Sequence, residues 1–184
     1  MKPGLLLHIC CGPCASVVVQ RLKERYQLTG FFYNPNIFPA EEYERRRTAA
    51  ARVADYWQIP LITGEYEHDR FLEAVAGLEA EPEAGARCPV CFELRLGVTA
   101  QQAVRSGFGF IASTLTVGPN KNAALVNSIG SRVGAELGIG FVAGDWKKQD
   151  GFRQSVEISR QLSLYRQHYC GCEFSLRNRR GAHH

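Results

Sequence analysis

Cysteine is the residue type whose spacing most restricts what this 184-residue chain can do. Its seven cysteines fall into three tight groups with the patterns C-C-x-x-C, C-x-x-C and C-x-C. Thiols that served only as small core hydrophobes would be scattered, whereas neighbouring thiolates at these spacings can reach one metal ion or one iron–sulfur cluster. We therefore interpret all seven as metal ligands: Cys10, Cys11, Cys14, Cys88, Cys91, Cys170 and Cys172.

The number of thiolates favours two metal centres. One tetrahedral zinc or one cubane cluster takes four protein ligands, so seven suggest a four-ligand cluster beside a three-coordinate metal with an open position. An open position lets a metal act as a Lewis acid. Because side chains alternate at a strand end, Cys10 and Cys11 should face different centres. This predicts cluster ligation by Cys10, Cys88, Cys91 and Cys172, and a catalytic single metal held by Cys11, Cys14 and Cys170.

The elements that must position these groups alternate between strands and helices. Apolar runs typical of buried strands occupy 4–9, 29–33, 60–63, 108–112 and 139–143. Helical patterns occupy 13–25, 40–57, 68–78, 91–106, 121–137 and 151–165. Such alternation predicts a doubly wound, parallel α/β sheet with right-handed crossovers. If strands one and four are neighbours, the order of the five strands is 3-2-1-4-5, and both lie at the switch point where such sheets bind ligands.

Length and composition are those of an ordinary globular protein. We expect one catalytic domain over residues 1–180, and we interpret 181–184, Gly-Ala-His-His, as a tag remnant or disordered tail. The apolar run after Gly4 is too short for a secretory signal, and no later run reaches membrane-spanning length. These features predict a cytoplasmic protein without membrane contact, in which thiols stay reduced and free to bind metal.

Polar and basic residues that follow the strands are candidates for substrate contact. The formal charge of +4 is modest, so an RNA partner has to be argued from local groups. Basic groups occur at 45–47, 147–148 and 177–180, and each is equally well explained as a solvated surface. The segment 145–148, Asp-Trp-Lys-Lys, could hold an anticodon loop by stacking and phosphate contact, or be a plain turn. His8, inside the first strand, is interpreted as a core histidine.

Six motifs of this chain, taken in order, resemble those of the cobalamin-independent epoxyqueuosine reductases. They run from Leu5 to Ser175 and so cover nearly the whole chain. The combination of three cysteine groups with Tyr-Asn-Pro-Asn is highly specific, although either part alone is weak. The motifs are LHICCGPC at 7–14, FYNPNI at 32–37, RCPVCF at 87–92, STLT at 113–116, DWKK at 145–148 and YRQHYCGC at 165–172.

The resemblance implies a fold related to adenine-nucleotide α-hydrolases and an activity in queuosine biosynthesis. The epoxide of epoxyqueuosine, at the wobble position of transfer RNA with a GUN anticodon, would be reduced to the alkene of queuosine. The implied cofactors are a [4Fe–4S] cluster and an adjacent mononuclear metal, iron. In some members an aspartate ligates that metal at the place of Cys14, so the all-cysteine set would be a departure. The motifs imply substrate-binding roles for Tyr33, Asn34, Asn36, Ser113, Thr114, Thr116, Asp145, Lys147 and Lys148.

The implied reaction needs electrons and protons from elsewhere. Removal of the epoxide oxygen as water takes two electrons and two protons. A cluster passes electrons singly, so we expect a reduced ferredoxin or flavodoxin as the donor. The sequence leaves the proton source open among metal-bound water, His168, Tyr169 and Asp145.

Two other functions remain open from the sequence. A zinc-stabilised RNA-binding module would use the same cysteines without catalysis. A thiol–disulfide oxidoreductase would use Cys11 with Cys14, or Cys88 with Cys91. An anaerobic absorbance spectrum separates the reductase from the zinc module, because an iron–sulfur protein is brown and a zinc protein is colourless.

Overall fold

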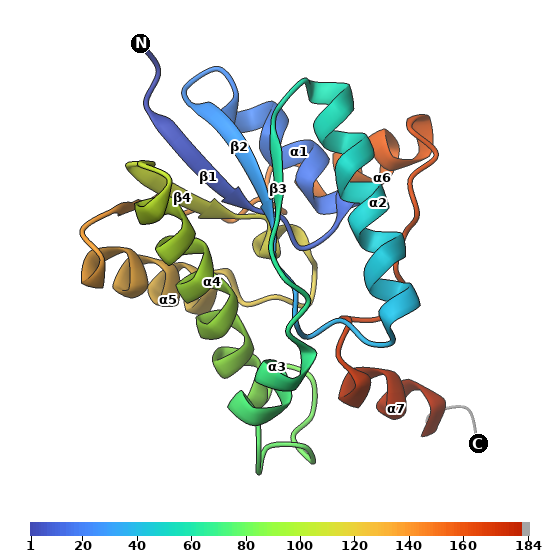
Figure 1. Cartoon of the computed structure of the whole chain (residues 1–184). Helices are drawn as coiled ribbons and strands as arrows, with labels where there is room; N and C mark the ends of the chain where they lie inside the picture. Colours follow the sequence, from blue (N-terminus) through green and yellow to red (C-terminus); the bar gives the residue numbers. More distant parts are fainter. Residues whose placement is uncertain (182–184) are drawn as a thin grey trace.

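The computed structural model describes residues 1–181, which form a five-stranded parallel sheet between two layers of helices (Figure 1). The strands are β1 (Gly4–His8), β2 (Gln27–Phe32), β3 (Leu61–Thr63), β4 (Phe110–Ser113) and β5 (Gly140–Phe141). They lie in the order β3-β2-β1-β4-β5, and every neighbouring pair is parallel. The predicted doubly wound α/β topology is therefore confirmed, with β1 and β4 side by side at its centre.

Helices cover both faces of this sheet (Figure 1). On one face lie α1 (Gly12–Leu22), α2 (Ala40–Trp57) and α6 (Gly151–Gln161), and on the other lie α4 (Arg87–Arg105) and α5 (Ala123–Glu136). Three short elements follow strand ends or precede the end of the described chain: α3 (His68–Ala74), the 3-10 turn η1 (Leu115–Val117) and α7 (Glu173–Gly181). No helix among residues 1–181 combines the length and the apolar character that a membrane span needs.

The central strand β1 is buried on both faces, which explains its unbroken apolar sequence. Leu5 and Leu7 belong to the apolar cluster under α1 and α2, whereas Leu6 belongs to the cluster under α4 and α5. All three side chains are fully buried. Alternation along one strand therefore supplies two cores, as expected of a parallel sheet covered by helices. The strand ends at His8, and the first cysteine group follows directly in the sequence.

Several element boundaries differ from the sequence prediction. Helix α4 begins at Arg87, so Cys88 lies on the helix and not in the preceding loop. The buried Arg87 guanidinium explains this, because it donates to the carbonyls of Leu78, Glu79 and Glu81 and holds the loop against the helix start. Helix α6 ends at Gln161, and Ser163 has a positive φ of 48°, which a continuing helix does not allow.

The end of the described chain was not predicted to be helical. Helix α7 continues to Gly181, and residues 182–184 of the predicted tail lie outside the described residues. In the basic segment of this helix, Arg177 forms an ion pair with Glu173. The side chains of Arg179 and Arg180 lie outside the described part, so their predicted role stays a prediction.

Candidate metal centre

Three sulfur atoms meet where β1 ends. The Sγ atoms of Cys10, Cys11 and Cys14 all lie within 4.8 Å of one another, and those of Cys10 and Cys11 are 3.8 Å apart. Two thiolates on one tetrahedral metal, each bound at about 2.3 Å, are themselves about 3.8 Å apart. These three cysteines, here called the sulfur trio, therefore have the spacing of ligands to a single ion.

That Cys10 and Cys11 face different centres stays a prediction, but their sulfurs lie side by side in the structure. The prediction assumed that strand alternation continues through Cys11, but β1 ends at His8 and Cys10 lies in a bend. Cys11 is the N-cap of α1 and has an extended backbone, with φ −168° and ψ 161°. Pro13 begins the helix, and the first turn carries Cys14 back beside Cys11. The bend and the helix start together turn all three sulfurs the same way.

The other four cysteines come from two segments that are distant in sequence. Cys88 and Cys91 lie at the start of α4, and Cys170 and Cys172 lie just before α7. Cys91 and Cys172 share a small apolar cluster with Phe174. Burial raises the pKa of Cys88 and that of Cys91, the latter to about 12, and charge on Cys170 and Cys172 adds to both shifts. These four thiols are therefore close enough to interact electrostatically.

Hydrogen-bond donors are directed at several of the sulfurs. Such donors favour the thiolate form that a soft metal requires, so the residues around the sulfurs suit a metal centre. The donors are the Ala84 backbone N–H to Cys88 (3.2 Å), the Thr114 hydroxyl to Cys10 (3.1 Å), the Gln167 amide to Cys11 (3.1 Å) and the Lys121 ammonium to Cys170 (2.9 Å).

The three thiols of the sulfur trio differ in the direction in which their pKa values are shifted. Hydrogen bonds from Cys11 and Cys14 hold the pKa of Cys10 well below its ordinary value, and the charge of Arg95 adds to this. In return, the hydrogen bond to Cys10 raises the pKa of Cys11 to about 12, and the pKa of Cys14 is also raised. A metal that binds here has to displace protons, so we expect its affinity to fall in acid.

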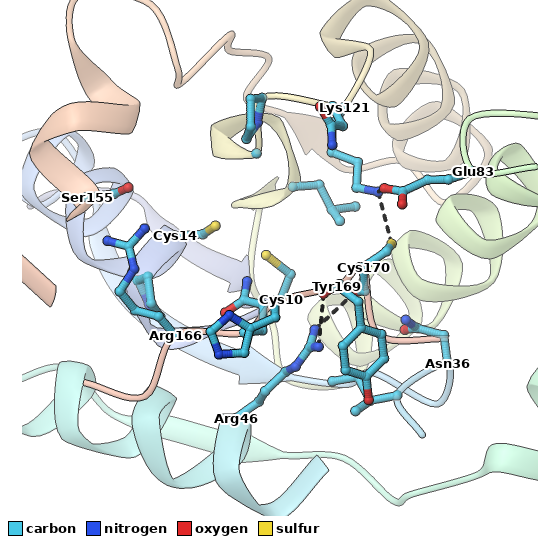
Figure 2. A pocket seen from close by; sticks show the side chains of 18 of the residues that line it. Cys10, Cys14, Asn36, Arg46, Glu83, Lys121, Ser155, Arg166, Tyr169 and Cys170 are labelled. Atoms are coloured by element: carbon cyan, nitrogen blue, oxygen red, sulfur yellow. Dashed lines mark hydrogen bonds and ion pairs between the residues drawn. The ribbon is translucent and has the colours of Figure 1, made fainter. Parts of the chain in front are cut away.

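A cavity of about 330 Å³ opens beside the sulfur trio (Figure 2). Cys10, Cys14 and Cys170 all line it, so it connects the trio with the C-x-C group of Cys170 and Cys172. Its volume lies in the range of small-molecule sites and can take one nucleobase-sized ligand. Phe152, a residue that is 41% exposed, also lines it.

The charged residues that line this cavity are mainly cations. Its charged residues are Arg46, Arg95, Lys121 and Arg166, against the single carboxylate of Glu83. Arg46 is already paired with Glu42 and donates to the carbonyls of Tyr169 and Cys170, so it holds the segment that carries Cys170. The remaining cations face a space where an anionic group or a developing negative charge would be stabilised.

Arg95 interacts with both Cys10 and Cys91, although it was not among the residues predicted from the sequence. Its positive charge lowers the pKa of Cys10 and opposes the rise at Cys91, and its guanidinium donates to the Asn34 side-chain oxygen. A usable signal existed, because Arg95 follows Cys91 by four residues on α4, and residues four apart share a helix face.

Of the nine predicted substrate-binding residues, Asn36 alone lines the cavity. Its side chain is buried, and its Oδ1 atom has no hydrogen-bond partner. A buried acceptor without a partner is costly, so a donor that reached this atom would be favoured.

Tyr33 and Asn34 hold the carboxyl end of β2 in place. The Tyr33 hydroxyl donates to Glu67 (2.7 Å), and the Asn34 amide donates to the Ile9 carbonyl (2.9 Å). Both residues lie outside the lining of the cavity. Asn34 still bears on the site, because its oxygen accepts the hydrogen bond from Arg95.

Ser113, Thr114 and Thr116 hold the segment that follows β4. Ser113 bonds to His8 (2.9 Å), Thr114 bonds to Cys10, and Thr116 donates to the Gly144 carbonyl (2.8 Å). His8 is fully buried between Ser113 and the Tyr33 carbonyl, and burial followed by the charge of Arg95 lowers its pKa to about 3. The interpretation of His8 as a core histidine is confirmed.

The segment 145–148 is fastened to the body of the protein. The Trp146 indole donates to the Ser113 carbonyl (3.0 Å), so its ring is packed and not free to stack on a base. Lys147 lies 3.4 Å from Asp145 and donates to the Lys121 carbonyl (2.7 Å). Lys148, at 77% side-chain exposure, is the one cation of this segment that faces solvent.

Of the three side chains predicted as proton sources, two line the cavity and one does not. His168 and Tyr169 belong to the lining, whereas Asp145 lies outside it. The Tyr169 hydroxyl donates to the Phe38 carbonyl, and burial raises the Tyr169 pKa to about 12. That proton is therefore both engaged and weakly acidic.

Comparison with known proteins points to one family. The family model described as "Epoxyqueuosine reductase QueH" matches residues 5–178. Curated relatives of the same name include one from Streptococcus pyogenes serotype M1, 36% identical over 95% of this chain and 71% of the relative. Another, from Acinetobacter baylyi, is 38% identical over 95% of this chain and 81% of its own. A third, from Thermotoga maritima, is 34% identical over 97% and 93%, respectively.

Proposed function

The chain belongs to the QueH family of epoxyqueuosine reductases, and we propose that it reduces the epoxide of epoxyqueuosine in transfer RNA to the alkene of queuosine. The observation that carries this proposal is the cationic cavity lined by sulfurs from two cysteine groups. A reductase needs an electron-carrying centre beside a space for its substrate, and an RNA-binding module without catalysis needs no such space.

We assign the sulfur trio to the single metal, iron, and the remaining cysteines to a [4Fe–4S] cluster. Among residues 1–181 the trio is the only group of three or more His, Cys, Asp or Glu ligand atoms within 4.8 Å of one another. Ligands of a cubane bind different iron atoms and are spaced more widely than ligands of one ion. Relative to the division predicted from sequence, Cys10 and Cys170 exchange places, and the cluster set becomes Cys88, Cys91, Cys170 and Cys172.

The reaction adds two electrons and two protons to the epoxide and releases water. When bound, the cluster supplies electrons singly and the open metal supplies a Lewis acid for the oxygen. Arg95 and Arg166 would stabilise negative charge that develops on the oxygen as its bond to carbon breaks. We assign proton delivery to His168, because the Tyr169 hydroxyl is already engaged.

The RNA substrate should present its modified base outside the stack. A recessed cavity cannot reach a base within the anticodon loop, so the base has to be extruded into it. We propose that Phe152 stacks at the cavity edge, that Asn36 accepts a hydrogen bond from the ligand, and that Lys148 contacts a phosphate. The substrate would be transfer RNA with a GUN anticodon in the cytoplasm, and the electron donor a reduced ferredoxin or flavodoxin.

Anaerobic purification followed by iron, sulfide and turnover assays tests the proposal. We expect about five iron atoms and about four sulfides per chain, with brown absorbance, and conversion of epoxyqueuosine in transfer RNA when a reduced flavodoxin is supplied. One zinc with no sulfide and intact RNA binding would instead identify an RNA-binding module. A metal-free protein that exchanges disulfides through Cys11 and Cys14 would identify a thiol–disulfide oxidoreductase.

A further inference from the structure

A partly buried ammonium group contacts a sulfur on the wall of the cavity (Figure 2). The Lys121 Nζ atom lies 2.9 Å from the Cys170 Sγ atom and 3.2 Å from a Glu83 carboxylate oxygen. Its side chain is only 13% exposed, and the Nζ atom lies 5.9 Å from the centre of the Phe92 ring. The ammonium therefore contacts a cysteine sulfur and a carboxylate and has an aromatic ring nearby.

The backbone around Lys121 is held from both directions. The following residue, Asn122, caps α5 by accepting a hydrogen bond from the Leu125 N–H (3.1 Å). The Lys121 carbonyl accepts from the Lys147 ammonium (2.7 Å). Ordering a long cation costs conformational entropy, and burying it costs desolvation energy. A lysine at this place therefore needs a contact that offsets both costs. The partner that it reaches is a cysteine sulfur.

Lys121 keeps its proton in this environment. The contacts of its Nζ atom with the Cys170 sulfur (2.9 Å) and the Glu83 carboxylate (3.2 Å) both favour the charged ammonium. The group is therefore a fixed positive charge with an N–H directed at sulfur. It is a poor proton donor to substrate, which separates its role from that assigned to His168.

We propose that Lys121 raises the reduction potential of the cluster through its hydrogen bond to Cys170, and that Glu83 moderates this effect. The inference rests on the proposed function, because it requires Cys170 to be a cluster ligand. Reduction adds one electron to the cluster from the external donor and breaks no bond, and the proton stays on Lys121. A positive charge and a hydrogen bond at a ligating sulfur both stabilise the more negative, reduced form. Lys121 is thus a tuning residue and not a catalytic one.

The two partners predict shifts of opposite sign. Replacing Lys121 by Met removes the charge and the donor at similar side-chain length, so the midpoint potential should fall. Replacing Glu83 by Gln removes the charge that opposes Lys121, so the potential should rise. Replacing Lys121 by Arg keeps both charge and donor and should leave the potential near that of wild type. A general loosening of the site would not give shifts of opposite sign.

A redox titration of the anaerobically purified holoprotein, followed by the reduced-cluster EPR signal, tests the inference. For Lys121→Met we expect at least a tenfold fall in the ratio of reduced to oxidised cluster at fixed potential, about 59 mV for a one-electron couple. Lys148→Met, which removes an exposed cation, serves as the matched control and should not shift it.

The outcomes separate this inference from the function on which it rests. A wild-type protein without any cluster overturns both. An intact cluster with an unchanged potential in Lys121→Met, or a shift to lower potential in Glu83→Gln, overturns the tuning role alone. Should Lys121→Met fail to assemble a cluster, the Glu83→Gln titration still decides the question by its sign.

Discussion

Substitution of Cys14 should distinguish the centre that activates the substrate from the centre that delivers electrons. If Cys14 helps to hold the single metal, Cys14→Ala should lose turnover while most of the visible absorbance of the cluster remains. Cys14→Asp should keep more activity than Cys14→Ala, because a carboxylate can also ligate iron. Turnover and anaerobic spectra of both variants check this, with Cys88→Ala as a control that should damage the cluster itself. Loss of the cluster in both Cys14 variants would show that Cys14 ligates it.

Phe152 carries the second prediction at the residue scale. Its exposed ring at the cavity edge offers a stacking surface, and stacking of one base on an aromatic ring contributes about 1–3 kcal/mol. Phe152→Ala should therefore weaken binding of an anticodon stem-loop by about 5- to 150-fold, without changing iron content. Tyr56→Ala is the matched control, because Tyr56 is 54% exposed on α2 and lies outside the cavity lining.

An unchanged Kd in an anaerobic titration of Phe152→Ala would remove Phe152 from the RNA contact. A normal Kd together with slower reduction by flavodoxin would instead assign the ring to docking of the electron donor.

At the scale of elements, the sulfur trio depends on the close approach of α1 and α2. A Cβ atom on Gly12 would lie 2.6 Å from the Ala49 carbonyl oxygen, which belongs to the backbone of α2 and cannot move aside by a rotamer change. Gly12→Ala should push the start of α1 outward and cost about 1–3 kcal/mol of unfolding free energy. It should also lower the content of the single metal, because Cys11 and Cys14 flank this position.

Gly97→Ala provides the control for that prediction. Gly97 lies inside α4, and a Cβ atom there would meet nothing within 4 Å. This substitution should raise the unfolding free energy by about 0.5–1 kcal/mol, because alanine loses less backbone entropy in a helix. Denaturant unfolding of both variants gives the comparison. Equal stability of the two would show that α1 and α2 tolerate the extra atom.

The carboxyl ends of β1, β2 and β4 meet at His8. This histidine should make a pH-dependent contribution to the free energy of unfolding. Its pKa is about 3 in the fold against 6.5 in the unfolded chain, so only the unfolded chain binds its proton between these values. The contribution to stability is whole above pH 6.5 and is lost progressively as the pH falls toward about 3. In this window His8 should add a slope of up to about 1.4 kcal/mol per pH unit.

His8→Gln isolates this term, since glutamine does not titrate. Unfolding free energies of both proteins, measured from pH 5 to 7 under the same metal load, should converge as the pH falls. Parallel curves would mean that His8 has the same pKa in the folded and the unfolded chain.

At the scale of the whole molecule, metal binding should fasten the last described segment to the body. Helix α7 reaches α4 through the Cys91, Cys172 and Phe174 cluster and through Arg87, whose guanidinium stacks 4.7 Å above the Phe174 ring. If the four proposed cluster ligands span these two segments, the cluster adds a covalent tie between them. A ligand bound only by the folded state stabilises it by about 4 kcal/mol at a thousandfold excess over its Kd.

Removal of the metals by chelation under anaerobic conditions should therefore lower Tm and raise hydrogen exchange most strongly over residues 162–181. Peptides from β1 and β4 are the internal control, because the apolar clusters around them do not depend on metal. Uniform exchange over the whole chain after chelation would contradict a local tie and indicate global unfolding.

Local sequence determined the fold class and the grouping of the cysteines. The parallel α/β class follows from apolar runs that alternate with helical periods, because each period is a property of a few consecutive residues. The order β3-β2-β1-β4-β5 required in addition that β1 and β4 be neighbours. The bounds of α2, in contrast, were predicted to the residue from its period. The three cysteine groups likewise needed no structure, since ligand spacing within one turn is fixed by the chain.

Only the tertiary structure decided how those groups combine and which other side chains join them. The direction of the Cys10 and Cys11 sulfurs depends on a bend and a helix cap, where neither the strand nor the helix period holds. Arg95 and Lys121 reach the cysteines by packing of α4 and of the segment before α5, and polar residues such as Tyr33 and Thr116 turn inward to hold strand ends. Contacts between segments so far apart in sequence leave no local period to detect, because they are selected by the packing of the whole chain.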